Sequence, residues 1–144
     1  MDLDAETFID TNLGRLPYVL YDTRGAKTAV LWAGSWHSDN HGSRGSPIAL
    51  SLASVLNQDY AISSLLLGYR HNHDLWNCVQ DIESGVTFLE TLGIQRIALV
   101  GHSFSGAAVI SAAPLNRNIT AVAALAAQTY GAQRAADVAP RPLL

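Results

Sequence analysis

The chain has 144 residues, of which 49% are hydrophobic, and a formal net charge of -3 at pH 7. This length fits one domain, and a high apolar fraction with a small net charge excludes a disordered chain. Nine Lys and Arg side chains stand against twelve Asp and Glu, without any basic run, so no nucleic-acid partner is expected.

Neither a membrane span nor an export signal is visible in the sequence. The longest apolar run, residues 121–127, is far shorter than the ~20 residues of a membrane-spanning helix. The first ten residues carry several acidic side chains, unlike a secretory signal. Cys78 is the single cysteine, which excludes an internal disulfide and a multi-cysteine metal site. We therefore expect a soluble, cytoplasmic domain without a membrane partner.

The first third of the chain reads as strands and one long loop. Residues 16–22 (LPYVLYD) are typical of a strand, with residues 7–11 as a hairpin partner. Residues 28–33 (TAVLWA) are continuously apolar, as in a strand buried on both faces. Residues 35–45 (SWHSDNHGSRG) are polar and rich in glycine, which predicts a long loop.

The first helix is expected to begin after Ser46, a good N-cap, with Pro47 at its first position. Its buried face is expected to carry the large apolar residues that recur at helical spacing, namely Ile48, Leu52, Val55 and Leu56. Residues 61–67 are the next expected strand.

A second helix is expected to start at Asp74 and to end at Gly93. Its apolar stripe consists of Val79, Ile82, Val86 and Leu89. The side expected to face water carries Asp81, Glu83 and Glu90.

The last third continues the alternation. Residues 96–100 predict a buried strand, followed by a tight turn and an Ala-rich helix that ends before Pro114. Residues 119–125 predict a strand, residues 130–137 a short helix, and residues 142–144 the start of one more strand. Such alternation is typical of a mostly parallel sheet with helices on both faces. In these sheets, sites form at the carboxyl ends of the strands.

The motif GHSFSG at residues 101–106 lies between an expected strand and a helix. A serine at such a sharp turn projects its hydroxyl above the sheet from a strained backbone, and here this residue is Ser103. The positions two before and two after the serine must be small, and they are Gly101 and Ser105. A dinucleotide loop would need glycine at position 103, and a P-loop would need lysine after Gly106. A turn whose small residues serve packing alone stays open as an alternative.

The N-terminus of the helix after Ser103 offers unpaired N–H groups. The N–H of Phe104 is expected to stabilise the oxyanion of a tetrahedral intermediate, as one half of an oxyanion hole. A second donor is expected from the loop after residue 33, with Ser35 as the first candidate and Trp36 as the next. Trp36 is also expected either to wall a substrate-binding pocket or to pack beneath the loop.

These residues resemble the α/β-hydrolase superfamily, with Ser105 where the pattern Gly-x-Ser-x-Gly has its second glycine. The resemblance covers roughly residues 14–144. It includes residues 33–34 (AG), where many relatives have His-Gly, and residues 68–70 (GYR), which resemble a strand end in small bacterial dienelactone-hydrolase-like and esterase-like proteins. Residues 139–144 (APRPLL) are similar to the run into the strand that ends near the catalytic acid.

The resemblance implies that an acid and then a histidine follow the serine, forming a catalytic triad. After Ser103 the sequence has one acid, Asp137, and no histidine. Asp137 precedes the last expected strand and is interpreted as a solvated residue at a helix end. We therefore expect residues 1–144 to be a C-terminally incomplete α/β-hydrolase domain, with its base and acid beyond residue 144. An open sheet edge near Leu143 and Leu144 predicts self-association.

None of the five histidines is a clear base or metal ligand. His102 precedes the serine and is interpreted as its packing or hydrogen-bonding neighbour. His37 and His41 are interpreted as polar loop residues at the edge of the site. His71 and His73 supply two donors where a zinc site needs three or four, so no metal is expected.

Three further features have alternative interpretations. Arg70 is expected to form a structural salt bridge, with Asp74 as a candidate partner, although it could also bind a substrate carboxylate. Cys78 is interpreted as a core thiol. Residues 42–45 (GSRG) are either a flexible loop or an anion cradle at the start of the helix after Ser46.

The sequence thus predicts a serine hydrolase that splits an ester or related acyl bond of a small-molecule substrate through an acyl-enzyme on Ser103, without a cofactor. Two alternatives stay open. One is a catalytically inactive fragment or a non-catalytic binding module with the same fold. The other uses Ser103 for acyl transfer or a lyase-type reaction.

Overall fold

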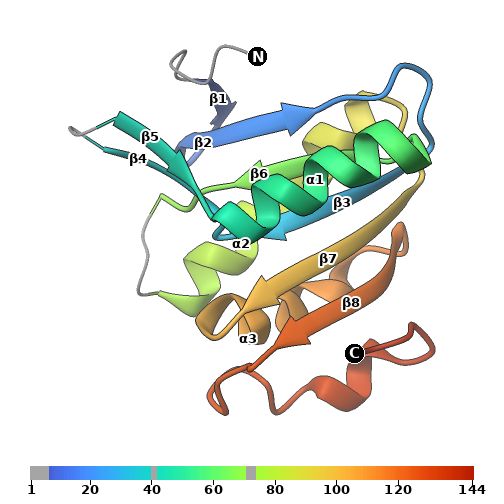
Figure 1. Cartoon of the computed structure of the whole chain (residues 1–144). Helices are drawn as coiled ribbons and strands as arrows, with labels where there is room; N and C mark the ends of the chain where they lie inside the picture. Colours follow the sequence, from blue (N-terminus) through green and yellow to red (C-terminus); the bar gives the residue numbers. More distant parts are fainter. Residues whose placement is uncertain (1–6, 40–41, 71–73) are drawn as a thin grey trace.

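A computed structural model describes residues 7–39, 42–70 and 74–144, and its centre is a six-stranded sheet in the order β1-β2-β6-β3-β7-β8 (Figure 1). The strands are β1 (Phe8–Thr11), β2 (Gly14–Tyr21), β3 (Thr28–Ala33), β6 (Ser63–Leu67), β7 (Arg96–His102) and β8 (Ile119–Leu125). β6, β3, β7 and β8 are parallel, whereas the hairpin of β1 and β2 joins them in antiparallel pairing. The predicted hairpin and the mostly parallel sheet are confirmed.

Helices lie on both faces of this sheet, as predicted (Figure 1). α1 (Pro47–Tyr60) covers β2 and β6 on one face, while α2 (Leu75–Thr91) and α3 (Phe104–Ala112) pack together on the other. The larger core cluster lies beneath α2 and α3, and the smaller one beneath α1. No helix in the described part of the chain is long and apolar enough to cross a membrane.

α2 confirms its predicted apolar stripe and its cap but not its predicted wet side. Asp74 caps the helix by accepting a hydrogen bond from the Asn77 N–H at 3.0 Å. Asp81 was expected in water, yet it is 1% exposed. Its carboxylate accepts a hydrogen bond from the backbone N–H of Arg70 at 2.9 Å and forms an ion pair with the guanidinium of the same residue. Arg70 is therefore structural, with Asp81 and not Asp74 as its partner. Cys78 is fully buried, as predicted.

α1 has the predicted N-cap, since the Ser46 hydroxyl accepts from the Ala49 N–H, but the predicted buried face was wrong. The exposed side of the helix carries Ile48, Leu52 and Val55, while Leu56 is half-buried. Ala49 and Ala53 face the sheet instead. The physical reason is volume: two buried indole rings fill this side of the core, so only small residues let the helix approach.

Residues 35–45, expected as a loop, contain a short antiparallel hairpin of β4 (Trp36–Asp39) and β5 (Gly42–Gly45) that projects beside β2 (Figure 1). Trp36 anchors it, because its side chain is only 4% exposed and belongs to the core beneath α1. Residues 42–45 are consequently a strand and not a flexible loop.

The end of the chain departs in one place from the prediction. α3 is followed by a 3₁₀ helix η1 (Ala113–Leu115), but residues 130–137 form no α-helix, and only the 3₁₀ helix η2 (Ala135–Val138) lies there. Leu143 bridges Val122 in parallel pairing, which confirms the predicted start of another strand beside β8. On the face of α1, a cleft of about 390 Å³ lies over β7 and β8 and is lined by alanines and by this terminal segment.

We propose that the 144-residue polypeptide associates with a second copy along the sheet edge at Leu143 and Leu144, because a largely apolar cleft lies beside this edge. Leu144→Lys should shift the chain toward monomer in analytical ultracentrifugation over a concentration series, because a lysine on an edge strand opposes strand pairing. Leu13→Lys, which changes another exposed leucine, on the β1–β2 turn, is the control. A wild-type chain that stays monomeric at high concentration would contradict the proposal.

Candidate functional site

Ser103 connects β7 to α3 in a left-handed backbone conformation, with φ 55° and ψ -114°. Its N–H donates to the Leu125 carbonyl at 2.9 Å, and its own carbonyl accepts from the Gly106 N–H at 3.0 Å. These bonds hold the turn between the ends of β7 and β8. The predicted strained serine at the strand-to-helix turn is confirmed, and the residue is exposed.

The small residues around Ser103 are required by backbone contacts. A Cβ on Gly101 would overlap the carbonyl group of Ser105. A Cβ on Gly106 would lie 2.9 Å from the Cβ of Ala127, which is closer than real side chains approach. The turn can therefore form only with glycine at both positions.

Phe104 is the first residue of α3, so its N–H has no carbonyl partner within the helix. The positive end of the helix dipole adds to the attraction of this group for negative charge. Its ring meets the ring of Tyr69 edge to face, with 6.5 Å between the centroids. The N–H of Phe104 is thus placed at the turn beside Ser103.

Ser35 does not fit its predicted role. Its N–H donates to the Leu67 carbonyl at 3.1 Å, and its hydroxyl donates to the Trp32 carbonyl at 2.6 Å. The N–H and the O–H of this buried residue both donate to carbonyls of β6 and β3, so neither is available to an oxyanion.

Trp36, the other candidate donor, keeps its N–H outside the β4–β5 ladder. In an antiparallel ladder, hydrogen-bonded and non-hydrogen-bonded residue pairs alternate. The Ser46 N–H donates to the Ser35 carbonyl, so the next pair, Trp36 and Gly45, is not hydrogen-bonded, and the Trp36 N–H points away from β5. The side chain of Trp36 packs in the core, which decides between the two interpretations of this residue in favour of packing.

A pocket of about 310 Å³ opens beside the turn, between the start of α1 and the ends of β3 and β7. Its walls are mainly apolar and include Trp32, Ile48, Val100 and Leu125. Trp32, and not Trp36, is therefore the tryptophan that lines it. His102 also lines the pocket, directly before Ser103 in the chain.

Tyr69 is a site residue that the sequence interpretation missed. Its hydroxyl lies 2.8 Å from the Ser105 hydroxyl in a hydrogen bond. Burial raises the pKa of the Tyr69 phenol, which the hydrogen bond to Ser105 only partly offsets, so the phenol stays protonated. The one available signal was serine in place of the second glycine of the motif, because a buried hydroxyl needs a partner.

No family model and no curated protein matches the sequence, whereas many solved structures match the fold. Est1E from Butyrivibrio proteoclasticus has a TM-score of 0.66 at 20% identity, over 85% of this chain and 50% of that one. An alpha-beta serine hydrolase homologue from Coxiella burnetii has 0.70 at 15%, over 99% and 73%. Dienelactone hydrolase from Anabaena variabilis has 0.65 at 21%, over 83% and 61%.

The chain has the α/β-hydrolase fold. It spans about half the length of Est1E. The order of the strands, the antiparallel β2 and the serine turn after β7 place Ser103 at the carboxyl edge of the parallel strands, where sites of open α/β sheets form.

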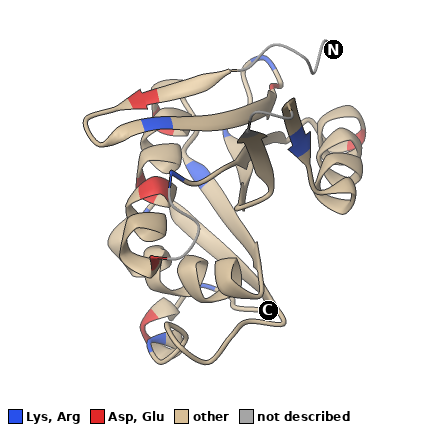
Figure 2. Ribbon diagram, turned by 90° about the vertical axis from the view of Figure 1, so that its left-hand side faces the viewer, with Lys and Arg blue, Asp and Glu red and all other residues tan. Residues whose placement is uncertain are grey.

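The other residues considered as a base, an acid or a metal ligand lie on other elements than Ser103 or outside the described residues. His37 is exposed on β4, opposite Arg44, and Asp137 forms an exposed ion pair with Arg134 at 2.7 Å. His41, His71 and His73 lie outside the described residues. Within residues 7–39, 42–70 and 74–144, no group of three or more His, Cys, Asp or Glu could hold a metal ion. Lys and Arg are scattered among the acidic residues (Figure 2).

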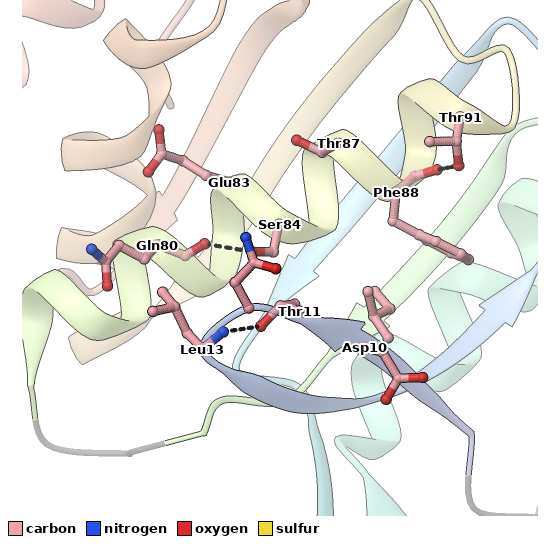
Figure 3. Close-up of a pocket in the computed structure, with 11 residues that line it drawn as sticks. Asp10, Thr11, Leu13, Gln80, Glu83, Ser84, Thr87, Phe88 and Thr91 are labelled. Carbon is pink, nitrogen blue, oxygen red and sulfur yellow. Dashed lines mark hydrogen bonds between the residues drawn. The ribbon is translucent and has the colours of Figure 1, made fainter.

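A larger groove of about 750 Å³ lies between the β1–β2 hairpin and α2 (Figure 3). It shares no lining residue with the pocket beside Ser103. Three of its hydroxyls donate to backbone carbonyls three or four residues away in the chain. Ser84 donates to the Gln80 carbonyl at 3.1 Å, Thr91 to the Phe88 carbonyl and Thr11 to the Gly14 carbonyl. The polar groups of this groove do not converge, so the candidate site is the pocket at Ser103.

Gly101→Ala is expected to destabilise the fold by about 2–3 kcal/mol or more, because the new methyl group would overlap the backbone of Ser105. Gly25→Ala is the matched control, since its φ of 77° costs ~1 kcal/mol while its Cβ meets nothing. Urea unfolding followed by circular dichroism measures both. Equal losses in the two variants would contradict the overlap.

Cys78 is expected to make the free energy of unfolding depend on pH in the alkaline range. Burial and then the charges of Asp81 and Asp74 raise the pKa of this thiol to about 12 from 9.0. Above pH 9 the thiol ionises in the unfolded chain but stays protonated in the folded one. Ionisation therefore favours the unfolded chain, and the free energy of unfolding falls as the pH rises from 9 toward 12. The slope approaches about 1.4 kcal/mol per pH unit. Urea titrations at pH 8.5–10 should show a flatter slope for Cys78→Ala, and an unchanged slope would refute this assignment.

Proposed function

We propose that the chain is the nucleophile-bearing part of a serine hydrolase that splits an ester or related acyl bond through an acyl-enzyme on Ser103. The observation that carries this is the strained turn, which exposes the Ser103 hydroxyl at the N-terminus of α3. The Ser103 Oγ would attack the carbonyl carbon, its proton would pass to a base, and the alcohol would leave. Water would then release the acid from Ser103.

The oxyanion of this reaction would be stabilised by the N–H of Phe104 and by a second donor after β3. Ser35 is spent on the sheet, so we propose the N–H of Trp36, which the β4–β5 ladder does not use. Two backbone donors at a helix N-terminus and a neighbouring loop are the arrangement that acyl transfer requires.

The base and the acid are proposed to come from polypeptide outside these 144 residues. After Ser103 the sequence contains no histidine, and its one acid, Asp137, is paired with Arg134 at the surface. Without a base, the oxyanion donors and binding alone would leave a residual acceleration of ~10³-fold over water, as in triads that lack a member.

The substrate is proposed to be a small carboxylic ester whose acyl or alcohol group enters the pocket beside Ser103. The walls of this pocket are mainly apolar, and its volume of about 310 Å³ suits a small molecule. One solved structure of Est1E has ferulic acid bound.

A single buried thiol supports the proposal that the chain works in a reducing compartment such as the cytoplasm.

A fluorophosphonate probe tests the proposal, because stabilisation of the developing oxyanion accelerates its reaction with a serine even where no base is present. We expect labelling of Ser103, identified by peptide mass spectrometry, at least ~10³-fold faster than free serine. Ser103→Ala should abolish the labelling. Ser84→Ala, which removes an exposed hydroxyl on α2, is the matched control and should leave it unchanged.

Labelling no faster than that of free serine would contradict the proposal and would favour a binding module with the hydrolase fold. Turnover of an activated ester that survives Ser103→Ala would equally contradict it. If labelling occurs, product analysis with an added alcohol separates hydrolysis from acyl transfer.

A further inference from the structure

Three segments that are far apart in the sequence meet at one buried hydrogen bond. Tyr69 follows the end of β6, Ser105 is the second residue of α3, and their hydroxyls lie 2.8 Å apart. Gly34, the first residue after β3, packs against both of them. A Cβ on Gly34 would overlap the Ser105 hydroxyl and would lie 2.8 Å from the Cε2 of Tyr69.

The turn at Gly34 is thereby held from two sides. Directly after Gly34, the Ser35 N–H donates to the Leu67 carbonyl, which ties the turn to β6. On the other side, Gly34 rests on the Ser105 hydroxyl and on the ring of Tyr69. Gly34 has φ 66°, a left-handed conformation that lets the chain bend away from the sheet toward Trp36.

The hydrogen bond between the two hydroxyls is built into the fold. Ser105 is 8% exposed, and its hydroxyl plays no part in capping α3, because Ser103 is the N-cap residue. The phenol of Tyr69 is protonated, so one of the two hydroxyls donates and the other accepts. Removing either hydroxyl would leave the other without its partner in a buried place.

We propose that the Tyr69–Ser105 hydrogen bond positions the oxyanion site by holding the turn at Gly34 at a fixed separation from the N-terminus of α3. This inference rests on the proposed function, since it concerns the same site. One oxyanion donor, Phe104, directly precedes Ser105, and the other, Trp36, lies two residues after Gly34. Such donors must lie about 2.7–3.1 Å from the oxyanion, so a small shift of either segment weakens both bonds together. Tyr69 and Ser105 are positioning residues, because they act through these backbone groups.

A double-mutant cycle tests the proposal on the 144-residue chain. Tyr69→Phe removes one hydroxyl and keeps the ring, while Ser105→Ala removes the other and keeps the Cβ. Each is expected to lower the second-order rate of fluorophosphonate labelling at Ser103 by about five- to tenfold, and the double variant to lower it no further. Tyr18→Phe, a half-buried tyrosine packed on Phe88, is the matched control and should label at the wild-type rate. Ser105→Gly, which restores the residue of the family pattern, should behave like Ser105→Ala.

Amide hydrogen exchange measured by NMR gives a second readout that needs no reactive serine. Tyr69→Phe should speed exchange about five- to tenfold at Ser35 and Gly106, whose N–H groups donate to the Leu67 and Ser103 carbonyls, and should leave the amides of α2 unchanged. Faster exchange that is equal in α2 and at the site would indicate general destabilisation and would overturn the proposal. Additive losses of labelling in the double variant, or unchanged exchange, would also overturn it. If wild-type Ser103 is not labelled at all, the proposed function fails, and the exchange data alone still decide whether the bond holds the turn.

Discussion

The backbone crossing of Gly101 and Ser105 is the contact on which the site depends. Their backbones lie so close that no side chain fits at position 101, and this crossing forces Ser103 into its left-handed conformation. Such a conformation costs on the order of 1–3 kcal/mol and persists only where the surroundings hold it. Here α3 is buried from Ser105 to Ala112, and hydrogen bonds from Ser103 and Gln128 tie the turn to the end of β8. The packing of α3 therefore stabilises the conformation that exposes the serine.

The two faces of the sheet contribute differently to this arrangement. Beneath α2 and α3, large branched side chains form the main core, and Gly85 lets α2 lie directly on Leu67 and Leu31. Beneath α1, two tryptophans occupy the volume, and the helix is fully buried against them only at Ala49 and Ala53, while Leu50 and Leu56 pack at the edge. The Ser103 turn rests on the densely packed face, while the pocket beside it opens on the face of α1, where less of the sheet is covered. A rigidly held turn next to an accessible cavity is an arrangement that suits a binding site.

The parts of the fold that sequence could predict are those determined by neighbours in the chain. Continuous apolar runs predicted β3, β6, β7 and β8, and six consecutive residues were enough to predict the Ser103 turn. The buried face of α1 was mispredicted because it depends on the tryptophans that it meets, and Asp81 because its burial depends on Arg70. The β4–β5 hairpin escaped prediction because its residues are polar and it is anchored by Trp36 alone. The errors on α1 and on Asp81 both concern partners that lie outside the mispredicted helix.

The same distinction explains why one of the two predicted oxyanion donors, Ser35, does not fit its predicted role. The position of Phe104 follows from helix geometry alone, since the first N–H of a helix has no internal partner. The second donor depends on the register of the parallel strands, which pairs Ala33 with Leu67 and Trp32 with Val100. In this register the Ser35 N–H meets the Leu67 carbonyl, and the residues just beyond the three strand ends come together. The hydroxyl of Ser105 then meets that of Tyr69, so a substitution of one small residue for another in the motif adds a hydrogen bond between α3 and the segment after β6. The motif can be read from neighbouring residues, whereas the effect of Ser105 in place of its second glycine depends on which residues the sheet brings beside it.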